Sequence, residues 1–110
     1  MSMTEKLQSE IKTIVKTLAD TGMASKIILF GSMARGENLP NSDIDLCVLT
    51  PITDRRPIDI TIDLRKAIRK LQKTSLDLLT YHQDEFAYHA ARPTSFEHEI
   101  DKEGVVVYER

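Results

Sequence analysis

Two aspartates, Asp43 and Asp45, lie two residues apart in a stretch whose apolar residues alternate with other types. In an extended strand, residues two apart share one face and lie about 6.6 Å apart along the chain. Aspartate is poorly suited to strands, so a pair on one face of an apolar strand suggests a chemical role, such as binding one or two cations. Taken alone, the pair is also typical of a strand end or a loop cap.

A third aspartate, Asp77, has the same position in a second apolar run, with Leu76 and Leu78 on either side of it. If the two strands are neighbours, three carboxylates meet at one point. Unit charges about 5 Å apart repel by about 3 kcal/mol at an effective dielectric of about 20. Protons or divalent cations relieve such repulsion, and oxygen ligands alone suit Mg²⁺ or, as an alternative, Mn²⁺. We therefore expect Asp43, Asp45 and Asp77 to hold a divalent cation.

Gly31 and Ser32 directly follow an apolar run and open a segment, residues 32–37, that could form a short helix. Glycine allows a tight turn and the close approach of a phosphate. The free N–H groups at a helix start favour an anion, and the Ser32 hydroxyl adds a donor. Alone, Gly-Ser after a strand is ordinarily a turn and an N-cap. Beside a carboxylate–cation site, it indicates phosphoryl or nucleotidyl transfer.

Alternating helices and strands must position these residues. Helical periodicity runs from Leu7 to Leu18 and from Ile60 to Leu71, and a further helical region is interrupted near Pro93. Ser2 with Glu5, and Thr94 with Glu97, fit capping boxes, and Gly22 suits a left-handed helix end. The remaining predicted segments are strands at 26–30, 43–50, 75–80 and 105–108 and a loop at 38–41. This order predicts an α+β (mixed α/β) fold with helices mainly on one face of a mixed four-stranded sheet.

The composition excludes several classes of protein. The 110 residues fit one domain, 1–110, with 41% hydrophobic and 29% charged residues. The net charge is −2 and like charges form no long block, so we expect no direct nucleic-acid binding. The single cysteine, Cys47, excludes an intramolecular disulfide and is expected in the core. Neither a signal peptide nor a membrane span is evident, so we expect a cytoplasmic protein without membrane association.

The segment Gly31-Ser-Met-Ala-Arg-Gly36, followed by Ser42-Asp-Ile-Asp-Leu46, resembles the GSxxRG…SDxDL signature of the polymerase-β-like nucleotidyltransferases. The whole chain, including the short ending from Glu103 to Glu109, is most similar to the minimal nucleotidyltransferase (MNT) domains. This composite motif is highly specific, because chance matches to all its parts in the right order of elements are rare. The resemblance implies the polymerase-β-like nucleotidyltransferase fold and a metal-dependent transfer of a nucleoside monophosphate from ATP.

The resemblance also implies roles for individual residues. Gly31 and Ser32 would hold the triphosphate, Ser42 would belong to the nucleotide-binding motif, and Arg35 would support the loop or a phosphate. The metal ligands and catalytic residues would be the three aspartates: Asp43 and Asp45 on both metal ions, and Asp77 on the catalytic metal, where it would assist deprotonation of the acceptor hydroxyl.

Proteins of this size that the chain resembles are commonly encoded beside a HEPN ribonuclease toxin. They act as antitoxins that add AMP to a tyrosine of the toxin or bind it, so the resemblance implies a HEPN-type toxin as partner and a hetero-oligomer. Degenerate members lack the third carboxylate; Asp77 supplies it here, so we expect an enzyme. The alternative is a non-catalytic module that neutralises its partner by complex formation. Transfer to a small molecule is disfavoured, because it would need an extra domain to hold the acceptor.

Overall fold

Residues 4–37 and 42–110 are the part of the chain described by the computed structural model, and along them single helices alternate with strands except for two successive helices before the last strand. The strands are β1 (Lys26–Phe30), β2 (Ile44–Thr50), β3 (Leu76–His82) and β4 (Val105–Glu109). The helices are α1 (Glu5–Asp20), α2 (Gly31–Ala34), α3 (Pro57–Ile68), α4 (Gln83–Ala90) and α5 (Phe96–Glu103). Within the described ranges, none of these helices combines the length and the apolar character needed to cross a membrane.

The four strands form one mixed sheet in the order β3-β2-β1-β4. Strand β1 is antiparallel to both β2 and β4, whereas β2 and β3 are parallel and are joined through α3. A parallel pair needs such a crossover, since a tight hairpin can join only antiparallel strands. The predicted α+β fold with a mixed four-stranded sheet is therefore confirmed.

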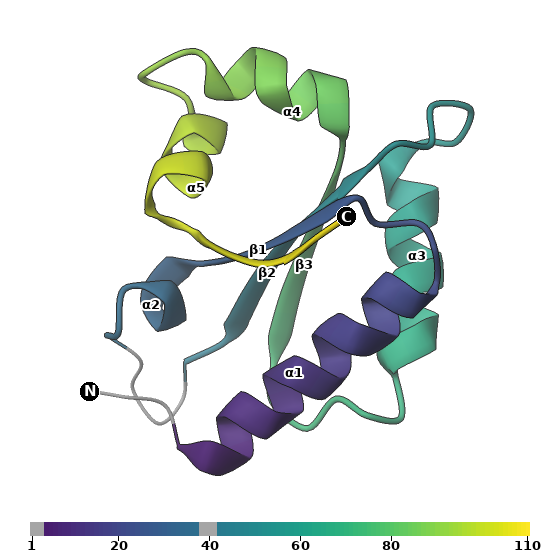
Figure 1. Cartoon of the computed structure of the whole chain (residues 1–110), viewed down its shortest axis with the longest axis vertical. Coiled ribbons are helices and arrows are strands. Elements are labelled where there is room, and N and C mark those ends of the chain that lie inside the picture. Colours follow the sequence, from purple (N-terminus) through teal and green to yellow (C-terminus); the bar gives the residue numbers. More distant parts are fainter. Residues whose placement is uncertain (1–3, 38–41) are drawn as a thin grey trace.

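The two longest helices, α1 and α3, cover one face of the sheet and build the larger core (Figure 1). Both helices have the predicted apolar stripe, and the strands turn every second side chain toward it. The side chains that are fully buried there come from α1, α3 and the central strands: Ile14, Leu18, Ile27, Ile44, Leu46, Val48, Ile60, Leu64 and Ile68. Burying each such side chain stabilises the fold by about 1.5–3 kcal/mol.

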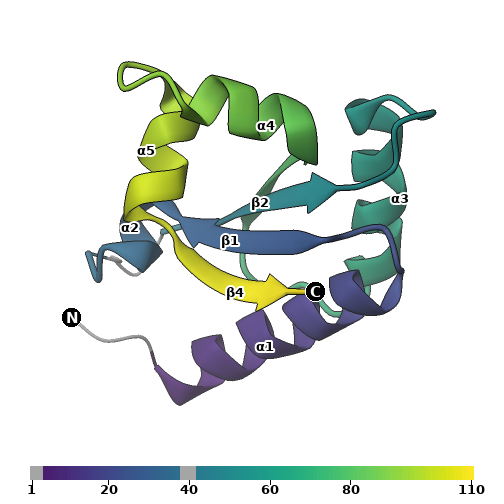
Figure 2. The ribbon, with the colours of Figure 1, turned by 45° about the horizontal axis from the view of Figure 1, so that its top comes forward.

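The opposite face of the sheet is covered by α4 and α5 (Figure 2). Cys47 and Ile28 of the sheet pack there with Phe86 of α4 and Ile100 of α5. The larger helices do cover one face, as the sequence predicts, and this second, smaller core is an addition to the prediction. It forms because the central strands are apolar on both faces, so the second face also has to be shielded from water.

Several element boundaries differ from the predicted ones. Helix α1 is capped by Thr4, whose hydroxyl accepts the N–H of Leu7 (3.2 Å), while the predicted cap Ser2 lies outside the described residues, as does the predicted loop at 38–41. Helix α5 is capped by Ser95 instead of the predicted Thr94. The predicted left-handed glycine at the end of α1 is confirmed, since Gly22 has φ +78°.

Glu10 of α1 fixes the loop that leads into β3. Its carboxylate accepts hydrogen bonds from the backbone N–H groups of Lys73 (2.7 Å) and Thr74 (2.8 Å) and from the Thr74 hydroxyl (2.7 Å). Burial raises the pKa of Glu10, but these hydrogen bonds and the charge of Lys73 outweigh burial and hold the pKa below its ordinary value. In the same loop, the carbonyl of Ser75 accepts the N–H of Ile44 (2.8 Å). Glu10 therefore ties α1 to the point where β2 and β3 begin.

We expect Glu10→Ala to lower the free energy of unfolding by about 1–2 kcal/mol at neutral pH, since three hydrogen bonds to a carboxylate are lost. The folded pKa of Glu10 lies below the unfolded one, so its stabilisation is present above the unfolded pKa and is lost as the pH falls through the folded pKa. Wild type and variant should therefore converge in acid. Urea denaturation at pH 7 and below pH 4 measures both effects. Glu5→Ala, in the exposed first turn of the same helix, is the control, and an equal loss in both variants would contradict the assignment.

Candidate active site

Three neighbouring strands place Phe30, Asp45 and Asp77 in one row across the sheet. Asp45 of β2 is the register partner of Phe30 on β1 and of Asp77 on β3. Register partners in adjacent strands direct their side chains to the same face. That face is the one covered by α4 and α5, because Cys47, two residues after Asp45, packs in their core. The predicted convergence of these two acids is thus confirmed for Asp45 and Asp77.

Asp43 lies just before β2, which begins at Ile44 and not at the predicted residue 43. Its side chain is exposed, and its charge acts on Asp45. Within residues 4–37 and 42–110, no three His, Cys, Asp or Glu side chains already converge tightly enough to hold a metal ion. The structure therefore brings two of the predicted acids together as a pair and places the third at the margin.

The electrostatics of the pair are unfavourable. Burial raises the pKa of Asp45, and the charge of Asp77, a hydrogen bond with its side chain and the charge of Asp43 raise it further, to about 6; Arg35 opposes this rise. A carboxyl group with such a pKa shares a proton or attracts a cation more readily than an isolated aspartate does. This position therefore favours a bound cation at neutral pH.

In metal-free protein, we expect Asp45→Asn to raise the free energy of unfolding at neutral pH, because it removes a charge that the folded state disfavours. The increase should be only about 1 kcal/mol, since solvent screens this partly exposed side chain. The pKa of Asp45 is about 6 in the folded state, above its ordinary 3.8. The protonated carboxyl of Asp45 contributes its whole stabilisation below the unfolded pKa, and this contribution is lost as the pH rises through the folded pKa of about 6. The advantage of the variant should thus grow between pH 4 and pH 7. Chemical denaturation in the presence of a chelator measures it, and a difference that does not change with pH would contradict the prediction.

Gly31 packs directly against Asp45. It has φ +75°, a conformation that side-chain-bearing residues rarely adopt. A Cβ atom at this position would overlap Oδ2 of Asp45 and lie 3.1 Å from its Cγ. The sequence suggests that this glycine leaves room for a phosphate, and in the structure the same absence of a side chain also leaves room for the Asp45 carboxylate.

The remaining predicted nucleotide-binding residues, Ser32, Arg35 and Ser42, lie in the chain between Gly31 and Asp43. Ser32 is half-buried in the first turn of α2, a turn whose N–H groups have no partner within the helix. Arg35 is exposed and forms a salt bridge with Glu37 (Nε to Oε2, 2.8 Å), so its guanidinium is engaged outside the carboxylate pair. Ser42 is half-buried just before Asp43. All three residues precede Asp45 in the chain, and their binding roles stay predictions.

Tyr81 and Glu97 form a contact that the sequence did not single out. The Tyr81 hydroxyl donates a hydrogen bond to Oε2 of Glu97 (2.9 Å), which joins β3 to the first turn of α5. Burial, followed by this carboxylate, raises the pKa of Tyr81. Tyr81 lies four residues after Asp77 and therefore on the same face, a period-two signal that the sequence does contain. The bond holds α5 over the face that carries Asp45 and Asp77.

Cys47 is fully buried on this face. Burial raises the pKa of its thiol to about 12, so the thiolate form is negligible at neutral pH. The prediction that Cys47 is a small core residue is confirmed.

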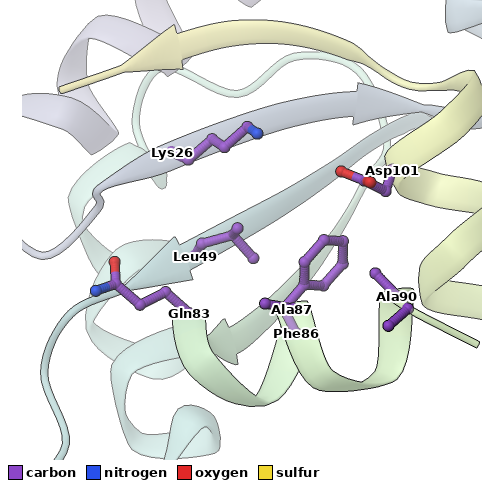
Figure 3. Close-up of a pocket in the computed structure, with 8 residues that line it drawn as sticks. Lys26, Leu49, Gln83, Phe86, Ala87, Ala90 and Asp101 are labelled. Carbon is purple, nitrogen blue, oxygen red and sulfur yellow. The ribbon is translucent and has the colours of Figure 1, made fainter.

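A separate pocket of about 310 Å³ lies at the other end of the same sheet face (Figure 3). It is lined by Lys26, Leu49, Gln83, Phe86, Ala87, Ala90, Ala91 and Asp101. Leu49 is four residues from Asp45 on β2, about 13 Å along the strand. The pocket is therefore distinct from the carboxylate pair.

Comparison with known proteins places this arrangement in context. Residues 8–104 match the profile of the nucleotidyltransferase domain family. A Methanocaldococcus jannaschii protein, provisionally named a protein adenylyltransferase, is 35% identical over 79 residues, which cover 68% of this chain and 79% of the relative.

Two solved structures share the fold at lower identity. One is described as a minimal nucleotidyltransferase, with 22% identity, a TM-score of 0.63, and coverage of 96% of this chain and 95% of the other. The second is a complex of a tri-AMPylated Shewanella oneidensis HEPN toxin with an MNT antitoxin, with 20% identity, a TM-score of 0.53, and coverage of 94% and 72%. At these identities the two structures support the fold alone.

Proposed function

The chain belongs to the nucleotidyltransferase family, and from this premise we propose that it is an antitoxin that transfers AMP from ATP to a tyrosine hydroxyl of a partner HEPN-type toxin. The observation that carries the proposal is the pairing of Asp45 with Asp77 beside Gly31. The similarity to a protein named as an adenylyltransferase supports transfer of AMP to a protein. The similarity in fold to an MNT antitoxin with an AMPylated HEPN toxin supports the kind of partner.

The residues at this site fit a divalent cation. All the donors are carboxylate oxygens, which suit Mg²⁺ or, as an alternative, Mn²⁺. The raised pKa of Asp45 indicates excess negative charge, which a cation would relieve. Mg²⁺ is usually held by one or two carboxylates together with substrate phosphates, so two paired acids and a marginal third are an adequate set. Asp43, Asp45 and Asp77 would hold the ion, which when bound would neutralise charge on the phosphates.

The Gly31–Ser32 turn would hold the triphosphate of ATP. Gly31 lets the backbone approach closely, and the first-turn N–H groups and the Ser32 hydroxyl supply hydrogen-bond donors. The turn directly follows Phe30, the register partner of Asp45, so the phosphates would lie beside the carboxylates. Arg35 would stabilise the turn or a phosphate, and Ser42 would bind the nucleotide from the segment before β2.

In the proposed reaction, the tyrosine oxygen attacks the α-phosphorus of ATP. A bond forms between that oxygen and the α-phosphorus, and the bond from the α-phosphorus to the oxygen bridging to the β-phosphorus breaks. Pyrophosphate leaves with the electron pair, and the phenolic proton passes to the carboxylate of Asp77. Asp77 suits this task because its side chain is exposed and can reach a hydroxyl on another protein.

The test is to incubate the chain with ATP labelled at the α-phosphate, Mg²⁺ and the proposed HEPN-type partner toxin. We expect label on the toxin, with the mass of AMP on a tyrosine in peptide mass spectrometry. No label on the toxin, from protein shown by calorimetry to bind ATP and Mg²⁺, would count against the proposal.

The same experiment separates catalysis from binding alone. A variant with both Asp45→Asn and Asp77→Asn should lose labelling and, under the proposal, should also lose neutralisation of the toxin. Neutralisation that survives unchanged in this variant would favour the non-catalytic module predicted as the alternative.

A further inference from the structure

Phe96, the first residue of α5, has an aromatic side chain that is about half exposed. It is 51% exposed, and its ring meets that of Phe30 edge-to-face, with centroids 6.0 Å apart and an interplanar angle of 81°. Such pairs are worth about 0.5–1.5 kcal/mol beyond the area that they bury, so the ring has a defined position. Half of its surface nevertheless remains available for a further contact.

The position of Phe96 relates it to the carboxylates. Phe30 is the register partner of Asp45 and directs its side chain to the same face of the sheet. A ring in contact with Phe30 therefore lies at the β1 side of the row formed by Phe30, Asp45 and Asp77. The electrostatic influence of Glu99 and Glu103 on Arg35 places α5 beside the segment that follows Gly31 as well.

The chain on both sides of Phe96 is fixed. Ser95 caps α5 by accepting the N–H of His98 (2.9 Å), and its hydroxyl donates to the carbonyl of His89 (2.7 Å). Glu97 accepts the hydroxyl of Tyr81. An aromatic ring held between two anchored neighbours loses little conformational entropy when a ligand stacks on it.

We propose that Phe96 is the stacking platform for the purine base of the nucleotide, so that the base lies on the α5 side of the site while the triphosphate lies at Gly31 and Ser32. This inference rests on the proposed function. Stacking on an aromatic ring recognises the flat face of a base and not its hydrogen-bonding edge. The platform therefore favours the larger purines over pyrimidines and discriminates weakly between adenine and guanine.

Another exposed aromatic residue, Tyr88, fits this role less well. It is 64% exposed on α4, and its ring is engaged by His89 and by the guanidinium of Arg92, 5.6 Å from the ring centroid. Both partners lie within four residues of Tyr88 in the chain, so neither contact ties this ring to the carboxylate row. Tyr88→Leu is therefore a matched control, since it removes an exposed ring of similar size.

The experiment measures binding of MgATP and of magnesium tripolyphosphate, which has the phosphates without the base. Phe96→Leu should weaken MgATP binding about tenfold in calorimetry, and leave tripolyphosphate binding within about twofold. Phe96→Trp should restore MgATP affinity. Because the chain contains no tryptophan, this variant also places the sole tryptophan at the platform, and tryptophan emission excited at about 295 nm should change with MgATP and not with tripolyphosphate. Tyr88→Leu should bind both ligands like wild type.

Several results would overturn the inference. One is unchanged MgATP affinity in a Phe96→Leu variant that melts like wild type. A second is an equal loss of tripolyphosphate and MgATP binding, which would indicate a general disturbance. A third is a raised KM for the acceptor protein with unchanged MgATP affinity, which would assign the ring to the acceptor. If wild type binds neither ligand, the proposed function itself fails, and that result is distinct from the other three.

Discussion

Asp45→Asn and Asp77→Asn should each lower the rate of AMP transfer by about a thousandfold or more. Each substitution removes a negative ligand from the candidate cation site. A cation bound there would supply several kcal/mol of transition-state stabilisation, at about 1.4 kcal/mol per factor of ten in rate. The two side chains are register partners on adjacent strands, so the losses should be far from additive in the double variant. Single-turnover labelling of the toxin, with Mg²⁺ in excess, measures the rates.

The matched control is Asp101→Asn, which removes an exposed carboxylate on the same side of the sheet, at the separate pocket. It should transfer AMP at the wild-type rate. A circular dichroism spectrum and a melting curve establish that the inactive variants are folded. A rate of AMP transfer in Asp45→Asn within twofold of the wild-type rate would show that this carboxylate is not needed for the reaction.

Gly31→Ala should reduce transfer by about a hundredfold or more and should also destabilise the protein. The added Cβ atom would overlap Oδ2 of Asp45 and would lie 3.1 Å from its Cγ and 3.4 Å from its Cβ. The Asp45 side chain would therefore have to move. A misplacement of about 1 Å at a reacting centre can cost a hundredfold. The backbone at φ +75° adds a penalty of about 1 kcal/mol for any residue with a Cβ. Kinetic assays and thermal unfolding of the same preparation separate the two effects.

Gly22→Ala and Gly36→Ala are the controls for the backbone penalty. Both glycines have positive φ, +78° and +72°, but a Cβ at either would meet nothing within 4 Å. They should lose stability by an amount similar to the backbone penalty and retain transfer. Equal activity in the Gly31 and Gly22 variants would show that contact with Asp45 has no catalytic consequence.

Much of the fold can be predicted from the sequence, because local patterns determine it. The apolar stripes predict α1 and α3, and the alternation around Asp45 correctly assigns Cys47 to the same face. Asp77 between two leucines predicts an outward carboxylate on an apolar strand, and the structure shows it exposed between buried Leu76 and Leu78.

Other features depend on contacts that no local pattern encodes. The register of β2 with β3 is set after a crossover through α3, so the sequence predicts that Asp45 and Asp77 converge only on the condition that the strands are neighbours, and it does not predict that they are direct register partners. A glutamate within an amphipathic helix usually faces solvent, whereas the partners of Glu10 lie 63 and 64 residues further along the chain. The edge-to-face contact of Phe96 with Phe30 likewise joins residues from different elements.

The register between β2 and β3 determines whether Asp45 and Asp77 can form a site at all. If the register of β3 against β2 shifted by one residue, the side chain of Asp77 would point into the hydrophobic core under α1 and α3. Leu76 and Leu78 would then point to the opposite face of the sheet, where Asp77 is now exposed to solvent. Each leucine lost from the interior costs about 1.5–3 kcal/mol, and an unpaired charge there costs still more. The packing of the hydrophobic core therefore selects the register that pairs Asp45 with Asp77, and it does so without a bound nucleotide. We infer that variants without these aspartates can still fold, whereas substitutions that weaken the hydrophobic core would disturb the register of β2 with β3 even when all the aspartates are present.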